Sequence, residues 1–295
     1  MSATLPPRLG IVILVAVATT FAANHLCARI AFDHGASVAT GVATRATGTA
    51  LVLLLIMRLQ GIRVALPREL RPWALLAGIL IAVQSYCLYS AVALIPPALA
   101  LLVFQTSPML YVLLSWALGS PAPRPSAFPA MLLALAGLWL ALDIRSDHLA
   151  VRWSEIGTGV SWAFAGGASM SCVYYLNANA LKAVDGRLRT FVMTGVTALL
   201  VLGGGGAAGA LALPGDGIGW LGLALLTAFY CTAMTFLFIV LPRLGGAAST
   251  AALNFEPIAL LGLAWVFLGQ AVTPLQILGA FVVVGAIVWL GVAKR

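Results

Sequence analysis

Long apolar runs, separated by short polar breaks, follow one another along the whole chain. Each run has about the length of a membrane-spanning helix, since a bilayer core about 30 Å thick takes about 20 helical residues to cross. The runs are apolar on every side, whereas the strands of a membrane barrel alternate apolar and polar positions. The pattern therefore predicts an all-α integral membrane protein with ten transmembrane helices, at residues 9–31, 38–58, 73–95, 97–118, 127–143, 155–180, 189–212, 218–241, 247–268 and 274–293.

Composition agrees with a chain that lies almost wholly in the bilayer. Of the 295 residues, 62% are hydrophobic and 8% are charged, whereas a soluble domain averages about 25% charged residues. The predicted loops are too short for an extramembrane domain, so we expect the chain to act within the membrane. Cytoplasmic loops rich in Lys and Arg explain the net charge of +8, and we expect no nucleic acid as a partner.

The positive residues predict the orientation in the membrane. If the N-terminus is cytoplasmic, 12 of the 16 Lys and Arg residues fall on the cytoplasmic side. The four others are Arg29, Arg45, Arg145 and Arg152. Because Lys and Arg accumulate in cytoplasmic loops, we expect a multi-pass protein of the plasma (inner) membrane with both termini in the cytoplasm.

Two stretches of the chain resemble each other. Residues 97–119 align with residues 246–269, and this alignment brings Pro108 onto Pro257. A proline inside a helix removes one backbone hydrogen bond and kinks the helix. Two such kinks at equivalent positions are either hinges for a conformational change or static bends that shape the bundle.

The alignment divides the chain into two repeats of five helices, at residues 1–147 and 148–295. The helix after each aligned stretch carries a glycine, Gly137 in the first half and Gly285 in the second. Because five is odd, the two halves are expected to cross the membrane in opposite directions. Inverted repeats are typical of secondary transporters, whose substrate site lies near the midplane between the repeats.

These features together are similar to those of a known family. The five-plus-five layout, the two prolines, the NFEP segment at 254–257, the Leu-Gly pair at 268–269 and Arg45 in the second helix resemble the EamA group of the drug/metabolite transporter superfamily. Each motif alone is weak, but their order and spacing cover essentially the whole chain. The aromatic-rich third, sixth and eighth helices resemble those of aromatic amino-acid exporters in that group. Gln270 departs from the family, in which Glu often follows the Leu-Gly pair.

Polar and aromatic side chains gather near mid-depth on many of the predicted helices. Polar residues at one depth indicate a shared cavity, although each taken singly is also explained by a hydrogen bond between helices. Tyrosines and a tryptophan there either stack on an aromatic substrate or only pack the bundle. The candidate substrate-binding residues are Asn24, His25, Gln84, Tyr86, Tyr89, Gln105, Trp162, Tyr174, Tyr230 and Glu256.

Glu256 carries the strongest functional signal because it lies at a predicted helix centre. A carboxylate at that depth costs about 2.5–3.5 kcal/mol on insertion scales, so such residues mark functional sites by default. Three roles are open: binding the amino group of a substrate, carrying a coupling proton, or forming a structural pair with Arg45 at similar depth. Asn254 points almost opposite to Glu256 on the helix, so only one of the two squarely faces a cavity.

The expected function is a secondary transporter that exports small, partly apolar metabolites, either aromatic or other neutral amino acids, by alternating access. A multidrug or other metabolite carrier of the same fold is the alternative. We expect no enzyme, because the sequence has no His-rich cluster, no paired mid-membrane carboxylates and no nucleophile set. We expect no cofactor or metal, since the four cysteines form no CxxC pair. The oligomeric state is left open, a monomer included.

Overall fold

The computed structural model describes residues 7–142, 149–240 and 250–293, and every regular element among them is a helix. The predicted junction of the repeats, the loop with Arg243 and both chain ends lie outside the described residues. The elements are α1 (Pro7–Asp33), α2 (Val38–Leu59), η1 (Arg68–Leu70), α3 (Arg71–Leu94), α4 (Pro97–Phe104), α5 (Ser107–Ala117), α6 (Ala127–Ala141), α7 (Leu149–Ala178), α8 (Gly186–Ala207), α9 (Gly217–Val240), η4 (Thr250–Phe255), α10 (Glu256–Leu268) and α11 (Pro274–Ala293).

The helices have the length and composition of a membrane protein. Within the described residues, six of them are long and apolar enough to cross a bilayer, and three shorter apolar helices cover Ala127–Ala141, Leu253–Leu268 and Pro274–Leu290. Large apolar side chains such as Leu199 and Trp265 are exposed on the outside. A soluble protein rarely exposes so much apolar surface, so the prediction of an all-α membrane protein is confirmed.

The observed helix bounds follow the predicted ones with local differences. α7 begins at Leu149, ahead of the predicted start at residue 155. α8 ends at Ala207, short of the predicted end at residue 212. The early end is explained by Gly209, whose φ of 63° is left-handed and whose N–H donates to the Gly206 carbonyl, as in common helix C-caps.

The two proline-bearing helices are broken rather than merely bent. α4 ends at Phe104 and α5 begins at Ser107, with Pro108 in its first turn. In the second half, the 3₁₀ helix η4 ends at Phe255 and α10 begins at Glu256, again with proline in the first turn. Proline has no N–H to donate to the carbonyl four residues earlier, and it is favoured in the first turn of a helix. The chain therefore restarts its helix at each proline.

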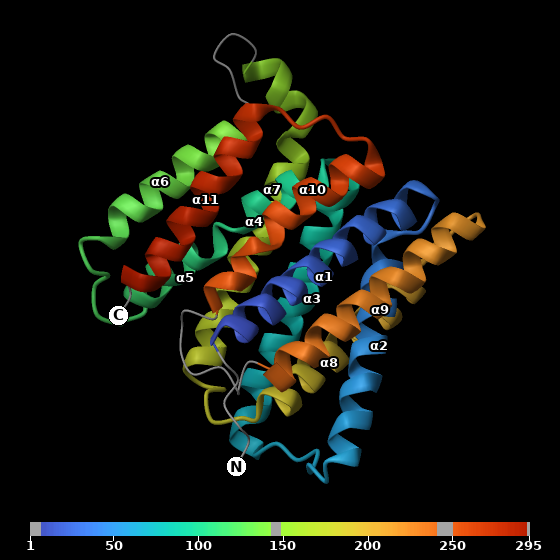
Figure 1. Ribbon diagram of the computed structural model, residues 1–295. Helices are drawn as coiled ribbons and strands as arrows, with labels where there is room; N and C mark the ends of the chain where they lie inside the picture. Colours follow the sequence, from blue (N-terminus) through green and yellow to red (C-terminus); the bar gives the residue numbers. More distant parts are fainter. Residues whose placement is uncertain (1–6, 143–148, 241–249, 294–295) are drawn as a thin grey trace.

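The broken helices lie against unbroken ones. α4 and α5 pack on α7, and η4 and α10 pack on α1. α1 also packs on α9, α3 on α7, α2 on α8, and α6 on α11 (Figure 1). The first turn of α1 and the last turn of α11 lie toward the same end of the bundle, at the lower left of Figure 1.

Close backbone contact joins α6 to α11. A Cβ atom added at Gly137 would lie 2.8 Å from the backbone nitrogen of Val283 and 3.0 Å from the carbonyl oxygen of Gly279. Gly285, which the sequence alignment matched with Gly137, has open space around it. On α11, the glycine that allows close contact with α6 is therefore Gly279. Gly285, the residue that aligns with Gly137, lies on another face of α11.

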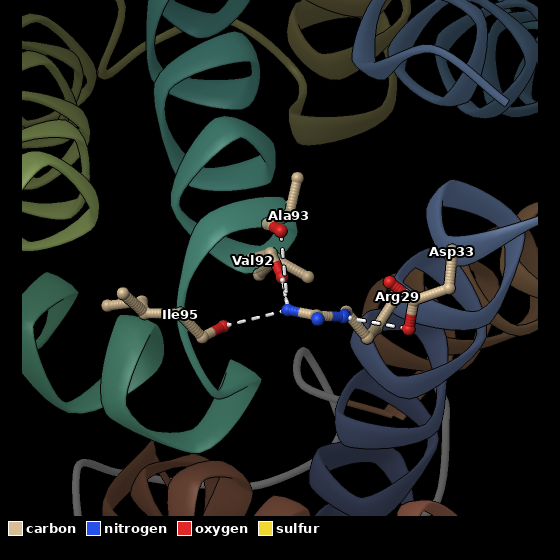
Figure 2. Close-up of polar contacts among 5 residues, drawn as sticks. All are labelled: Arg29, Asp33, Val92, Ala93 and Ile95. Atoms are coloured by element: carbon tan, nitrogen blue, oxygen red, sulfur yellow. Dashed lines mark hydrogen bonds and ion pairs between the residues drawn. The ribbon is translucent and has the colours of Figure 1, made fainter. Parts of the chain in front are cut away.

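Polar contacts at the helix ends hold the loops in place. Figure 2 shows Arg29 of α1 at the end of α3, where its Nη1 atom donates to the carbonyls of Val92, Ala93 and Ile95 at 3.1, 3.3 and 3.4 Å. Its Nε atom donates to Asp33 at 2.9 Å. The last carbonyls of a helix have no partner within the helix, so Arg29 supplies donors that the end of α3 lacks.

Candidate functional site

Arg45 is a buried cation in the middle of α2, with 6% of its surface exposed. Its Nη2 atom donates to Ser85 Oγ at 2.7 Å. Its guanidinium carbon lies 4.1 Å from the ring centroid of Tyr230 and 4.5 Å from that of Tyr89. A guanidinium over the face of an aromatic ring is attracted by the ring. The two rings that flank Arg45 therefore come from α9, the eighth predicted helix, and from α3, the third.

A chain of hydrogen bonds holds the side chain of Tyr89 in place. Tyr89 is fully buried, and its hydroxyl donates to Asn24 Oδ1 at 3.0 Å. Asn24 in turn donates from Nδ2 to the carbonyl oxygen of Leu226 at 2.6 Å. Because both polar groups are used within the protein, Asn24 and Tyr89 hold α1, α3 and α9 together and orient the ring that Arg45 contacts. Gln84 joins the edge of this network, since Ser85 Oγ donates to its Oε1 at 3.3 Å.

Glu256 has a different partner from the one that the sequence suggested. Its Oε1 atom lies 3.3 Å from Nε2 of His25. The ion pairs found within the described residues do not join Arg45 to Glu256, which lies against His25 instead. His25 is 5% exposed, and its Nδ1 atom is buried without a hydrogen-bond partner.

The position of Glu256 on its helix also favours a charge. It is the first residue of α10. The first N–H groups of a helix have no partner within the helix, and the helix dipole favours an anion there. Its side chain keeps 23% of its surface exposed, so the carboxylate that faces His25 is also accessible.

The first helix break adds polar groups that have no partner. Thr106 Oγ1 and Ser107 Oγ are buried and form no hydrogen bond. Gly167 of α7 lies against the break, since a Cβ atom there would be 3.2 Å from the carbonyl oxygen of Phe104 and from Thr106 Oγ1. Tyr174 of α7 lies close enough to Ser107 and to Glu256 for both to act on its hydroxyl. Tyr174 therefore bridges the two helix breaks.

Tyr230 occupies the centre of the arrangement. Its ring carries Arg45 on one face, and its hydroxyl also interacts electrostatically with Glu256. Phe21 of α1 supports the ring in an edge contact at 5.8 Å. One tyrosine thus interacts with both a buried cation and a partly exposed acid. We name the group of Arg45, Tyr89, Tyr230, His25 and Glu256 the central cluster.

Other candidates lie elsewhere. Tyr86 and Trp162 are 42% and 37% exposed, and their rings meet edge to face at 6.2 Å. The described contacts do not link this pair to Arg45 or Glu256. Gln105 lies in the first helix break and is half-buried. The sequence had proposed the members of the central cluster by their depth, and it did not propose the contact of His25 with Glu256.

A cavity of about 470 Å³ opens near one end of the bundle. Tyr111 and Ser115 of α5, Arg124 of the following loop and Asn179 after α7 are among the residues that line it. The ring of Tyr111 meets that of Tyr174 edge to face, with centroids 6.0 Å apart. Tyr111 therefore lies between the cavity and Tyr174. No group of three or more metal-binding side chains occurs in the part of the chain that the structure describes.

Comparison with known proteins matches the first half of the chain to a family. The match covers residues 8–142, which include Arg45, Tyr89 and the first helix break. This segment belongs to the EamA-like transporter family. The resemblance to the EamA group that the sequence motifs indicated is confirmed by this match.

Two curated relatives resemble nearly the whole chain. The threonine/homoserine exporter RhtA of Escherichia coli strain K12 is 25% identical over 286 residues, which are 96% of this chain and 91% of that protein. The exporter of the same name from Salmonella typhimurium strain SL1344 is 25% identical over 282 residues, with the same coverage. One crystal structure shares the fold with a TM-score of 0.66 and 18% identity, covering 98% of this chain and 99% of that one. The chain is therefore a multi-pass membrane protein similar to transporters.

Proposed function

We propose that this protein is a secondary exporter of small, amphipathic metabolites, with neutral amino acids as the substrate class. The EamA-like family is a family of transporters, and the relatives that match 96% of the chain are named as amino-acid exporters. The same comparisons speak against an enzyme, since the family and the relatives transport their substrates. The proposal rests above all on the central cluster beside the two helix breaks.

Ionisable residues in a membrane bundle are rare and face its interior or a water-filled cavity. Here Arg45 and Glu256, of opposite charge, both interact with Tyr230. Broken helices in transporters line the substrate site, because their free backbone groups can bind a polar ligand. A zwitterionic metabolite suits a site with one group of each charge, whereas an apolar drug needs neither.

We further propose that residues 1–147 and 148–295 are inverted repeats. The packing of helices supports this, because exchanging each helix for its counterpart in the other half reproduces the contacts. α1 against α9 corresponds to α7 against α3, and α4 with α5 against α7 corresponds to η4 with α10 against α1. Pro108 and Pro257, each in the first turn after a break, are then equivalent hinges for alternating access.

We propose that substrates enter from the cytoplasm. The cavity of about 470 Å³ lies beside Arg124, in a loop that the positive-inside rule assigns to the cytoplasm. At the loops of the opposite side, Ser37 N donates to the Ala212 carbonyl at 3.0 Å and Gly215 N donates to the His34 carbonyl at 2.9 Å. These bonds between the α1–α2 and α8–α9 loops favour a state that is closed toward the outside.

Transport in proteoliposomes tests this function. Vesicles holding the purified protein are loaded with unlabelled amino acid and given labelled threonine, homoserine, phenylalanine or a cationic dye. We expect counterflow of neutral amino acids above that of protein-free vesicles. Counterflow of the dye alone would instead support a multidrug carrier. Absence of counterflow for every amino acid, with protein shown by its melting curve to be folded, would refute the proposal.

A further inference from the structure

Arg45 is a buried positive charge that no carboxylate of the described residues neutralises. Ion pairs within those residues include His25 with Glu256, Arg29 with Asp33, His34 with Asp216 and Arg187 with Asp185, and none of these four contains Arg45. Buried charges in proteins are ordinarily paired, because removing an ion from water is costly. Arg45 therefore lacks the group that a buried guanidinium normally has.

The neighbours of Arg45 orient it without neutralising it. Tyr89 and Tyr230 offer ring faces, and Ser85 accepts one hydrogen bond from Nη2. The hydroxyl of Tyr89 donates to Asn24, and its oxygen lies close enough to accept from Arg45. A guanidinium has five N–H donors, so most of those of Arg45 are left for another partner.

The surroundings of Arg45 suit an anionic ligand. Arg45 is buried, with 6% of its surface exposed, and two aromatic rings hold its guanidinium in place. Among the described residues, its hydrogen bond of normal geometry comes from Nη2. A buried guanidinium with donors to spare and no carboxylate beside it attracts an anion.

We propose that Arg45 binds the carboxylate of the transported substrate, while Glu256, which also interacts with Tyr230, binds the substrate's ammonium group. This assignment rests on the proposed function, because it requires a substrate that carries one group of each charge. Each of these groups binds the residue of opposite charge in the central cluster. A carboxylate matches the planar fork of a guanidinium and accepts two parallel hydrogen bonds from it. Glu256 uses Oε1 toward His25, and its Oε2 is left for the ammonium group.

The assignment defines which molecules are accepted. A ligand must bring a carboxylate to Arg45, so amino alcohols and amino-acid esters bind far more weakly than the parent amino acid. Losing one partner of a buried charge pair costs at least about 2 kcal/mol, which corresponds to about a 30-fold loss of affinity. The side chain of the substrate contributes less to this selection than its two charged groups.

The experiment compares threonine with threoninol, which has a hydroxymethyl group in place of the carboxylate. Counterflow of labelled threonine is measured in proteoliposomes with either compound as competitor. For the unaltered protein we expect threonine to compete at about 30-fold lower concentration than threoninol. In Arg45→Met we expect the uptake of labelled threonine to fall strongly. We expect threonine and threoninol to inhibit the remaining uptake equally. Arg63→Met, an exposed loop variant, serves as the matched control and should keep the preference.

The thermal melt separates binding from structure. Because Arg45 has no counter-charge in the protein, Arg45→Met should not lower the melting temperature, whereas loss of a structural partner would lower it. Threonine preference retained in folded Arg45→Met would overturn the inference while leaving the proposed function intact. Failure of the unaltered protein to transport any amino acid would overturn the proposed function itself.

A second measurement does not depend on a variant that folds. Phenylglyoxal modifies accessible arginines, and mass spectrometry of the unaltered protein reports modification at Arg45. We expect threonine to protect Arg45 and threoninol not to protect it. Arg63 should be modified equally in all samples. Equal modification of Arg45 with and without threonine, in protein that transports threonine, would contradict the assignment.

Discussion

His25 Nε2 lies 3.3 Å from Glu256 Oε1 and joins the first helix of the chain to α10 of its second half. The contact crosses from one proposed repeat to the other at the start of a helix restarted by Pro257. Other titratable or charged groups near this pair are Tyr89, which meets the His25 ring edge to face, Tyr174 and Tyr230. A change in the charge of Glu256 therefore acts directly on the contact between two halves that are proposed to move.

Glu256→Gln keeps the shape of the side chain and removes its charge and its proton. If Glu256 carries the coupling proton, the variant should fold, lose uphill transport driven by a pH gradient, and keep downhill exchange. Transport in liposomes with and without a pH gradient measures this. Glu69→Gln, in an exposed segment, is the control. Normal gradient-driven transport by Glu256→Gln would exclude the coupling role.

The stability of Glu256→Gln distinguishes its two proposed partners. Since the partner is His25, we expect a loss of about 1 kcal/mol, the usual net value of a hydrogen bond, in a thermal melt in detergent. Adding Arg45→Met should not restore that loss, because Arg45 forms no ion pair with Glu256. If Arg45→Met restored the stability lost in Glu256→Gln, the charges of Arg45 and Glu256 would be coupled.

The orientation is tested by reporters on both sides of the membrane. Fusions at residues 65 and 295 should report a cytoplasmic location, and a fusion near residue 148 a periplasmic one, because of the charge distribution. A cysteine in place of Asp216, whose side chain is 51% exposed, should react with an impermeant reagent added to whole cells. Opposite results at residues 65 and 148 would reverse the assigned direction of transport.

Aromatic recognition is tested with Trp162→Ala. If Trp162 and Tyr86 line the substrate path, uptake of phenylalanine should fall more than uptake of threonine. Tyr174→Phe in the same assay probes the hydroxyl that adjoins Ser107 and Glu256, and it should reduce uptake of both substrates. An equal loss for both substrates in Trp162→Ala would assign that residue to packing.

Close packing of α6 on α11 is tested by two glycines on α11. A methyl group at Gly279 would lie 2.6 Å from the Gly137 carbonyl oxygen, whereas one at Gly285 meets nothing within 4 Å. Gly279→Ala should therefore destabilise the protein by about 1–3 kcal/mol, as overpacking does. Gly285→Ala should leave the melting temperature unchanged or raise it. Similar melting temperatures for the two variants would contradict the observed contact.

The α7–α8 loop makes an acid-sensitive contribution to stability. The Arg187 side chain hydrogen-bonds Asp185 and lowers the pKa of that carboxyl from 3.8 to about 2. Ionised Asp185 therefore stabilises the folded state above pH 3.8, and this contribution is lost as the pH falls toward 2. Asp185→Asn lacks this contribution. The difference in melting temperature between the unaltered protein and Asp185→Asn should therefore become smaller as the pH is lowered from 3.8 toward 2. A difference in melting temperature that stays the same at every pH would rule the contribution out.

Much of the fold follows from local properties of the sequence. Apolar runs of membrane-spanning length predict where each helix lies, because every crossing must satisfy its own backbone hydrogen bonds. The effect of Pro108 and Pro257 is also local, since each lacks the N–H that the turn before it needs. The mid-depth residues were proposed as site residues for the same reason, as depth follows from position along a helix.

Partners across helices were decided by the tertiary structure alone. Arg45 and Glu256 have similar depth and opposite charge, and depth alone suggested that they pair. A helix that is apolar on all sides carries no pattern to show which neighbour each face meets, so its rotation is set only when the bundle packs. That packing turned Glu256 toward His25 and Arg45 toward the rings of Tyr89 and Tyr230. The same cause explains why Gly279, and not the aligned Gly285, touches Gly137.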